Sequence, residues 1–274
     1  MDKLRFGTAG IPTCTKGDTI QGIKDVNSLK LGSFELEFVR SINISEEKAP
    51  EIKKAAKDNN IVLTCHAPYF INLNSTDPKI FHASIGRIVK SANITSLCGG
   101  YSICFHAGFY QKQDPKKVYE NIKTGFKKIL DEVKEFDKNI WIRPEISGKI
   151  AQFGDLNELI KLSKDFDQVL PCIDFSHLFA RTVGKNNTLE EFNSILEQVK
   201  KIGKDSIKNM HIHVSGIEYG DKGEKHHLIL EESKFNYKDL MKALKEFKVK
   251  GYLTCESPNI EKDAILMKNY YEKI

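Results

Sequence analysis

The chain has 274 residues, with 42 Lys and Arg against 37 Asp and Glu, so its formal net charge is +5 with neutral histidine. Hydrophobic residues make up 40% of it, which excludes a mainly disordered chain. No uncharged apolar run approaches the roughly 18 residues that a membrane-spanning helix needs. Residues 1–10 lack the pattern of a signal peptide. We therefore expect a cytoplasmic protein, and the mild charge leaves its partner open.

The six cysteines do not predict a disulfide framework. No close CxxC pair occurs, and a chain of this length can bury a core without covalent cross-links. Cys65, Cys104, Cys172 and Cys255 lie in short apolar runs, where free cysteine behaves as a small hydrophobic residue. We expect these thiols to be reduced and buried.

Short apolar runs alternate with longer amphipathic segments along the chain. The segments between the runs have helical periodicity, and four of them have start signals at Ser45, Asp77, Asp114 and Thr188. The stretch between the first two runs predicts only a short helix. The runs are rich in β-branched and aromatic residues, as buried strands are, and cover residues 4–9, 34–39, 61–67, 101–107, 140–146, 169–175, 210–215 and 252–257.

Eight strand-like runs that alternate with eight helix-like runs predict an α/β protein, a single (β/α)8 TIM barrel. A doubly wound sheet is the competing interpretation, but the segment after the first run contains no GxGxxG loop. No Pro-, Gly- or Ser-rich linker divides the chain, so we expect one domain over residues 1–274. In such a barrel the chemistry belongs at the C-terminal ends of the strands.

Side chains that can bind metal ions stand at the ends of six consecutive expected strands. Among the eight histidines, only His82 lies in an expected helix. In chain order the strand ends supply His66, then His106, then Glu145, then Asp174 with His177 one turn later, then His211 and His213 with a polar loop that holds Glu224, His226 and His227, and finally Glu256.

Four carboxylates in one crevice would raise one another's pKa values, and divalent cations are the natural compensation. Sets of imidazoles and carboxylates without thiolate suit Zn²⁺, Mn²⁺ or Fe²⁺. The four carboxylates and at least five imidazoles make nine possible ligands. Nine ligands are too many for one ion and fit two or three ions that share a bridging carboxylate. Closely spaced divalent ions are typical of phosphoryl transfer, and no run offers a Ser or Cys nucleophile with a triad.

Several separated motifs resemble those of the endonuclease IV family, in the same order along the chain. That family comprises AP endonucleases with a (β/α)8 barrel and a trinuclear zinc site. The resemblance covers the chain from the third expected strand onward. The motifs are HAPYFINL (66–73), FHAG (105–108), PEISGK (144–149), CIDFSHLFA (172–180), MHIHVSG (210–216), GEKHH (223–227) and CESP (255–258).

The resemblance implies three zinc ions, with Mn²⁺ or Fe²⁺ as an alternative at one position. Glu145 would bridge the first two ions. The first would be held also by His66 and His106, the second by Asp174, His211 and Glu256, and the third by His177, His226 and Glu224, where the family usually has Asp. His213 stands where the family often has Asn, and we interpret it, like His227, as supporting the ligands rather than binding metal.

The resemblance also implies contacts with DNA. Tyr69 and Phe70 match the bulky side chains that wedge into the duplex at an abasic gap, where unstacking costs least. Packing of their own loop is the alternative interpretation. Arg40, in the short segment after the second expected strand, would be a further DNA contact.

Taken together, the resemblance implies a zinc-dependent hydrolase, an apurinic/apyrimidinic endonuclease of base excision repair. It would cleave double-stranded DNA 5′ to abasic sites, as a monomer, with Glu145 beside the attacking water. The alternative is a metal-dependent sugar isomerase or epimerase with one ion on a set such as Glu145, Asp174, His211 and Glu256. The additional imidazoles and Glu224 favour the nuclease, and a non-catalytic metal-binding barrel is a third hypothesis.

Overall fold

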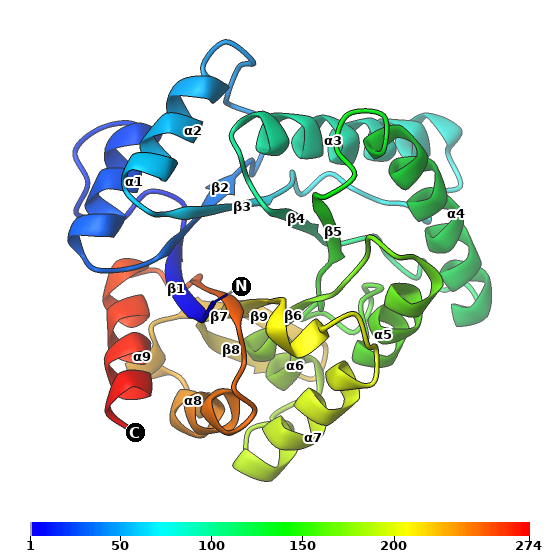
Figure 1. Cartoon of the computed structure of the whole chain (residues 1–274). Coiled ribbons are helices and arrows are strands. Elements are labelled where there is room, and N and C mark those ends of the chain that lie inside the picture. Colours follow the sequence, from blue (N-terminus) through cyan, green and yellow to red (C-terminus); the bar gives the residue numbers. More distant parts are fainter. Residues whose placement is uncertain (1) are drawn as a thin grey trace.

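The computed structural model describes residues 2–274, which form a ring of eight parallel strands surrounded by helices (Figure 1). Each of the eight expected strand runs overlaps one of these strands, so the TIM barrel is confirmed. Around the sheet the order is β5-β4-β3-β2-β1-β10-β7-β6. The strands are β1 (Leu4–Ala9), β2 (Ser33–Glu37), β3 (Val62–His66), β4 (Ser102–Phe105), β5 (Trp141–Pro144), β6 (Cys172–Asp174), β7 (Met210–Val214) and β10 (Gly251–Cys255).

The ring closes between β5 and β6, where pairing is sparse. Two isolated parallel bridges join the two sides, one between Ile142 and Val169 and one between Glu145 and Cys172. The amide of Ile146 donates to the carbonyl of Cys172 at 3.1 Å. This seam is the least continuous part of the barrel wall, and Glu145 stands at its C-terminal end.

Asp77, Asp114 and Thr188 cap their helices as expected, with side chains that accept hydrogen bonds from first-turn amides. Ser45 instead caps a turn, because α2 begins four residues later. The helices are α1 (Thr19–Ser28), α2 (Ala49–Asp58), α3 (Pro78–Leu97), α4 (Pro115–Val133), α5 (Leu156–Asp165), α6 (Phe175–Arg181), α7 (Leu189–Lys200), α8 (Tyr237–Glu246) and α9 (Glu261–Lys273), with 3-10 turns at Ser206–Lys208 and Leu230–Glu232.

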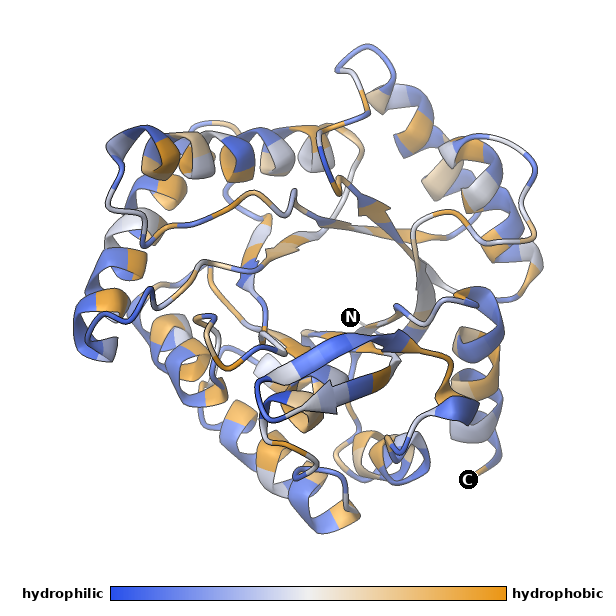
Figure 2. Ribbon diagram, turned by 180° about the vertical axis from the view of Figure 1, so that it is seen from behind, coloured by the Kyte–Doolittle hydropathy of each residue, from blue (hydrophilic) through white to orange (hydrophobic). Residues whose placement is uncertain are grey.

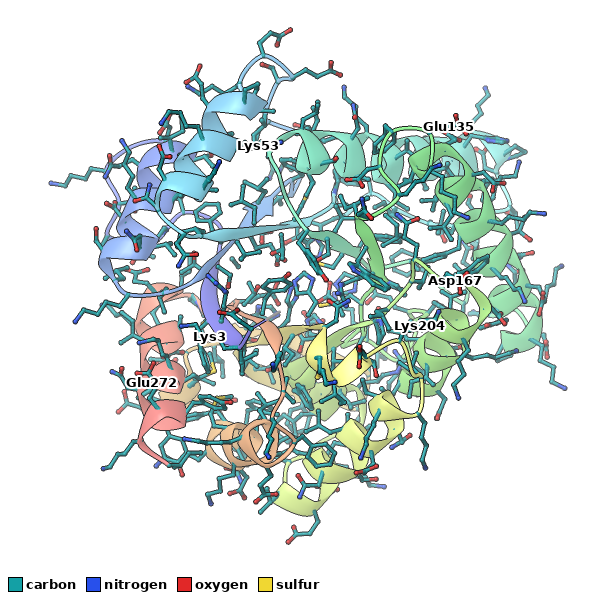
Figure 3. The ribbon with its side chains drawn as sticks, in the orientation of Figure 1. Lys3, Lys53, Glu135, Asp167, Lys204 and Glu272 are labelled. Atoms are coloured by element: carbon teal, nitrogen blue, oxygen red, sulfur yellow. The ribbon has the colours of Figure 1, made fainter. Side chains whose placement is uncertain are left out.

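The apolar core lies between the ring and the helices. Ile103 and Phe105 of β4, for example, belong to this core and are fully buried. The helices turn hydrophobic stripes toward the strands and hydrophilic ones outward (Figure 2). Side chains fill the middle of the ring (Figure 3), while Lys53, Glu135 and Glu272 on the helices and their ends are exposed. No helix within residues 2–274 is both long enough and apolar enough to cross a membrane.

Two local elements differ from the expectation. A short helix, α6, begins directly after β6. The expected polar loop after β7 is an antiparallel hairpin of β8 (Gly216–Gly220) and β9 (Gly223–Leu228), which crosses the front of the ring in Figure 2. The sequence of β9, GEKHHL, has almost no apolar residue, so hydrophobic alternation could not reveal it.

Gly251 tests the packing of β10 against β7. Its φ is +129°, and a Cβ there would collide with the backbone carbonyl of Met210. Gly251→Ala is expected to lower the free energy of unfolding by about 1–3 kcal/mol through strained backbone alone. The matched control is Gly86→Ala in α3, where a Cβ meets nothing within 4 Å and helix propensity favours Ala by up to about 1 kcal/mol. Urea unfolding measures both; equal stabilities of the two variants would contradict the packing.

Candidate metal centre

Glu145, which follows β5, lies at the centre of the histidine cluster. Its side chain is buried, and four imidazoles surround it. Its Oε2 lies 3.0 Å from His66 Nε2 and 3.7 Å from His106 Nε2. Its Oε1 lies 3.1 Å from His213 Nδ1 and 3.5 Å from His177 Nδ1. One carboxylate therefore joins side chains from β3, from the residue after β4, from β7 and from α6 at the C-terminal end of the barrel.

The junction between β6 and α6 positions Asp174 and His177. Asp174 ends the strand and caps the helix, since its Oδ1 accepts from the amide of His177 at 2.6 Å. This contact leaves Asp174 Oδ2 directed into the cluster, 3.3 Å from His177 Nδ1. Within residues 2–274, neither Asp174 Oδ2 nor Glu256 Oε2 has a hydrogen-bond partner, although both atoms are buried. Unpartnered carboxylate oxygens are suited to a cation.

The β8–β9 hairpin carries Glu224 and His227 to the cluster. Glu224 Oε2 lies 3.7 Å from His177 Nε2, and His227 Nε2 lies 3.3 Å from the same nitrogen. The amide of Glu224 donates to the carbonyl of Gly148 at 3.0 Å. A Cβ on Gly148 would come within 2.6 Å of Glu224 Oε2, so this glycine permits the close approach.

The structure does not bring His226 to this set, contrary to the expectation. Its side chain is 60% exposed and its Nε2 lies 3.7 Å from Glu218 Oε2. The cause is an irregularity in the hairpin: Glu218 pairs with His226 and Tyr219 with Glu224, which leaves Lys225 without a register partner. This bulge shifts the alternation of side chains, so His227 joins Glu224.

The structure also exchanges the expected positions of the two histidines on β7. His213 Nδ1 reaches Glu145 and lies 3.4 Å from Glu256 Oε1, whereas His211 lies deeper in the barrel. Register explains the difference, because His213 pairs with Asp174 and His211 pairs with Cys172. His211 therefore belongs to a lower layer than the carboxylates expected beside it.

Several histidines are oriented by hydrogen bonds at Nδ1. A carbonyl can only accept, so Nδ1 carries the proton in each such ring, and in the neutral imidazole the Nε2 lone pair turns to the cluster. The pairs are His66 with the carbonyl of Ala67 at 2.7 Å, His177 with that of Ile146 at 3.0 Å, and His227 with that of Glu256 at 3.1 Å.

His106 follows the same pattern through a hydroxyl. Ser147 Oγ donates to the carbonyl of Phe153 at 2.8 Å, so it accepts from His106 Nδ1 at 3.2 Å. The Nε2 atom of His106 then faces Glu145. Because the Nε2 atoms of His177 and His227 face each other at 3.3 Å, a positive charge must lie at this point, either a proton or a metal ion.

The pKa values of the cluster shift in both directions: those of His66 and Asp174 rise, which favours a bound proton, and that of His106 falls. Burial by itself lowers the pKa of His66, but the hydrogen bond and charge of Glu145 raise it to about 10. Burial raises the pKa of Asp174 to about 6 against the attraction of His177. Burial lowers the pKa of His106 to about 4. Divalent ions would replace the bound protons and satisfy both kinds of ligand.

Four groups of ligand atoms at this end meet the requirement that all atoms of a group lie within 4.8 Å of one another. Glu145 belongs to three of them, so it can bridge ions. The groups are His66 with Cys104 and Glu145; His106 with Glu145 and His177; His177 with Glu224 and His227; and Glu145 with Asp174, His213 and Glu256.

A cavity of about 350 Å³ opens over the cluster, and Tyr69, Phe109 and Lys149 contribute to its wall. Tyr69 and the neighbouring Phe70 are 57% and 61% exposed. The amide of Tyr69 donates to the carbonyl of Val39 at 3.1 Å, which joins this rim to the segment after β2. Arg40, on that segment, is exposed. The residues expected to contact DNA therefore lie at the cavity or on a segment bound to its rim.

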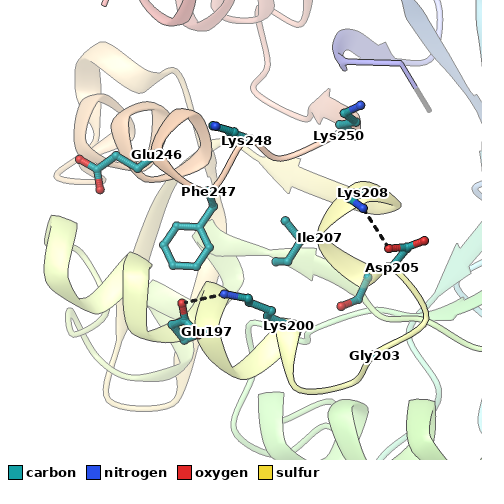
Figure 4. Close-up of a pocket in the computed structure, with 11 residues that line it drawn as sticks. Glu197, Lys200, Gly203, Asp205, Ile207, Lys208, Glu246, Phe247, Lys248 and Lys250 are labelled. Atoms are coloured by element: carbon teal, nitrogen blue, oxygen red, sulfur yellow. Dashed lines mark hydrogen bonds and ion pairs between the residues drawn. The ribbon is translucent and has the colours of Figure 1, made fainter.

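Larger hollows lie at the opposite end of the barrel, where the strands begin. One of about 700 Å³ is lined by Lys248 and Lys250, just before β10, and by two ion pairs, Glu197 with Lys200 and Asp205 with Lys208 (Figure 4). It has no histidine or cysteine in its lining. The histidine cluster thus lies at the C-terminal end and not in these hollows, as a TIM barrel predicts.

The sequence analysis missed two acids of β2. Glu35 Oε2 lies 2.7 Å from His211 Nε2, and Glu35 Oε1 lies 2.8 Å from His213 Nε2. Burial raises the pKa of Glu37 to about 8, although the charge of His66 opposes this shift. Two acids at alternate positions of the apolar run 34–39 place both on one face of the strand, and that pattern could have identified them.

Comparison with known proteins places the chain in a family. A family model described as the Xylose isomerase-like TIM barrel matches residues 23–270. An uncharacterized protein of Methanocaldococcus jannaschii is 43% identical over 272 residues, which cover 99% of this chain and 98% of that protein. A probable endonuclease 4 of Persephonella marina is 27% identical over 195 residues, 69% of this chain and 67% of that protein.

This chain shares its fold with solved structures from both enzyme classes considered above. Endonuclease IV from Thermus thermophilus superposes with a TM-score of 0.78 at 16% identity, over 98% of this chain and all of that one. A D-tagatose 3-epimerase-like protein superposes with a TM-score of 0.77 at 17% identity, over 98% of this chain and 96% of that one. By the family match over residues 23–270, the chain belongs to the xylose isomerase-like TIM barrel family.

Proposed function

We propose that the protein is a metal-dependent phosphodiesterase that cleaves DNA at abasic sites. The observation that carries the proposal is the convergence of imidazole and carboxylate ligands on Glu145 in three overlapping groups. A single-ion enzyme would not need such a set. The curated relatives named probable endonuclease 4 support the same activity.

The ligand sets that we propose follow the geometry. His66, His106 and Glu145 would hold one ion. Asp174, His213 and Glu256 would hold a second together with Glu145, and His177, Glu224 and His227 would hold a third. His213 and His227 thus replace His211 and His226. Zinc suits these nitrogen and oxygen donors. Divalent ions held there would supply an activated water for attack on phosphorus and would stabilise the leaving oxygen.

The protein's own residues would position the substrate. The exposed rings of Tyr69 and Phe70 lie beside the cavity, where they can stack into a gap in a duplex. Lys149 in the cavity wall supplies a positive charge for the DNA backbone. Tyr69 also contacts His66 edge-on, with ring centroids 5.6 Å apart, so the wedge and the ligand cluster form one unit.

A sugar isomerase or epimerase is the second candidate. The group of Glu145, Asp174, His213 and Glu256 could hold one divalent ion without the others, and the epimerase-like structure shares the fold. One observation opposes this candidate: the group of His177, Glu224 and His227 would then hold no metal ion. Metal content separates the two functions, since the nuclease needs at least two ions.

Incision of a duplex that contains one tetrahydrofuran abasic analogue tests the activity. The purified protein with two or more bound ions should cut 5′ to the analogue, and chelation should abolish cutting and lower the melting temperature, because bound ions stabilise the folded chain. An undamaged duplex is the control. The nuclease proposal would be contradicted if the protein bound fewer than two ions per chain and made no incision. Conversion of a ketohexose by such a protein would favour the isomerase.

The two neighbouring histidines of β9 provide a matched pair of variants. His227→Ala should lose one equivalent of metal and lower incision by roughly 100-fold or more, beyond the cost of losing an outer contact. His226→Ala should retain the metal and the activity, because its ring faces solvent and Glu218. Metal analysis and incision rates measure both. The reverse result would assign the ligand role to His226 and contradict the bulged register of the hairpin.

A further inference from the structure

A second set of ligands lies inside the barrel, one layer below the rim. Cys104, Cys172 and His211 point inward from β4, β6 and β7, and all three are fully buried. Their ligand atoms lie within 4.8 Å of one another, in a group that also includes His213. Cys172 and His211 are direct register partners on neighbouring strands, so the backbone fixes their separation.

Glu35 faces this group from β2. Its Oε2 lies 2.7 Å from His211 Nε2 and 3.7 Å from Cys104 Sγ. In a tetrahedral zinc site, the bond lengths put neighbouring ligand atoms about 3.3–3.8 Å apart. Cys104, Cys172 and His211 thus bring two sulfurs and one nitrogen close together. Glu35 adds an oxygen beside the nitrogen and the sulfur of Cys104.

Hydrogen bonds satisfy only part of this polar layer, in which Thr64 Oγ1 donates to Glu35 Oε2 at 2.7 Å. His211 Nε2 and Glu35 Oε1 have no hydrogen-bond partner within residues 2–274, although both residues are fully buried. His211 Nδ1 is 3.2 Å from the hydroxyl of Ser102, which leaves Nε2 for another partner. A cation beside His211 Nε2 would give this buried nitrogen a partner.

The charges of the layer are consistent with a bound divalent ion. Barrel interiors are usually filled with branched apolar side chains, but here the polar layer includes the fully buried Arg143. With an ion bound, two thiolates and Glu35 would carry three negative charges, which the divalent ion and the Arg143 guanidinium would balance.

We propose that Cys104, Cys172, His211 and Glu35 bind one zinc ion as a closed structural site, separate from the ions of the rim. Thiolate and imidazole donors select Zn²⁺ over the harder divalent ions, and four protein ligands leave no open position for substrate. The ion would connect β4 and β6 across the sparsely paired seam beside β5. It brings the cysteines, expected to be inert, into a functional role.

Cobalt provides a probe that responds to thiolate ligands. The full chain, stripped of metal and reloaded with Co²⁺, should show thiolate-to-cobalt charge-transfer absorption, which imidazole and carboxylate ligands do not produce. Cys172→Ser should abolish this band and lose one equivalent of metal. Cys172 is the informative cysteine because Cys104 also lies near His66 and Glu145, at the rim.

Controls separate this site from the rim and from misfolding. Cys98→Ser removes another buried thiol, at the end of α3, and should keep the band. His227→Ala should keep it too, since only a rim ligand is lost, so the result does not depend on incision activity. His211→Asn gives a second route to loss of the ion, and circular dichroism verifies the fold of each variant. A wild-type protein without the band, a band that survives Cys172→Ser, or a Cys104–Cys172 disulfide in place of metal would overturn the proposal.

Discussion

Glu145 is a carboxylate that the barrel withdraws from water and surrounds with imidazoles. Burying such a charge costs several kcal/mol unless opposite charge and hydrogen bonds accompany it. Its partners come from β3, from the residue after β4, from β7 and from α6, so segments far apart in the chain must meet at one point. The barrel provides this convergence because parallel strands end at a common rim. Although burial opposes ionisation, the surrounding imidazoles, with His106 and His213 foremost, hold the pKa of Glu145 well below its ordinary value.

Positions two residues apart on a strand share a face but lie in different layers, and this rule organises the interior. On β7, His213 reaches the rim while His211 stays below it; on β6, Asp174 and Cys172 divide in the same way. The upper layer of carboxylates and imidazoles opens to the cavity, and the lower layer, with the two thiols, is closed. The same strands thereby present one ligand set to solvent and another to the interior.

The sequence was sufficient for the strands and for most of the rim, because the barrel rule assigns the residue at each strand end to one place. The sequence did not show which of two nearby histidines on one strand would reach the metal-binding cluster. His211 and His213 differ only by layer, which depends on register with β6. His226 and His227 differ by the bulge at Lys225, a feature of hairpin pairing that apolar periodicity does not encode. Glu35 escaped attention because it stands in the middle of a strand and not at its end.

His213 is the residue through which the two layers affect each other. Its Nδ1 faces Glu145 and Glu256, while its Nε2 lies 2.8 Å from Glu35 Oε1 and 3.7 Å from Cys104 Sγ. A carboxylate behind an imidazole fixes the orientation of the ring and strengthens its donor nitrogen. Any change in the charge or position of Glu35 is thus transmitted to the rim through one ring. The polar interior beneath the rim therefore supports the geometry of the cluster in addition to filling the barrel.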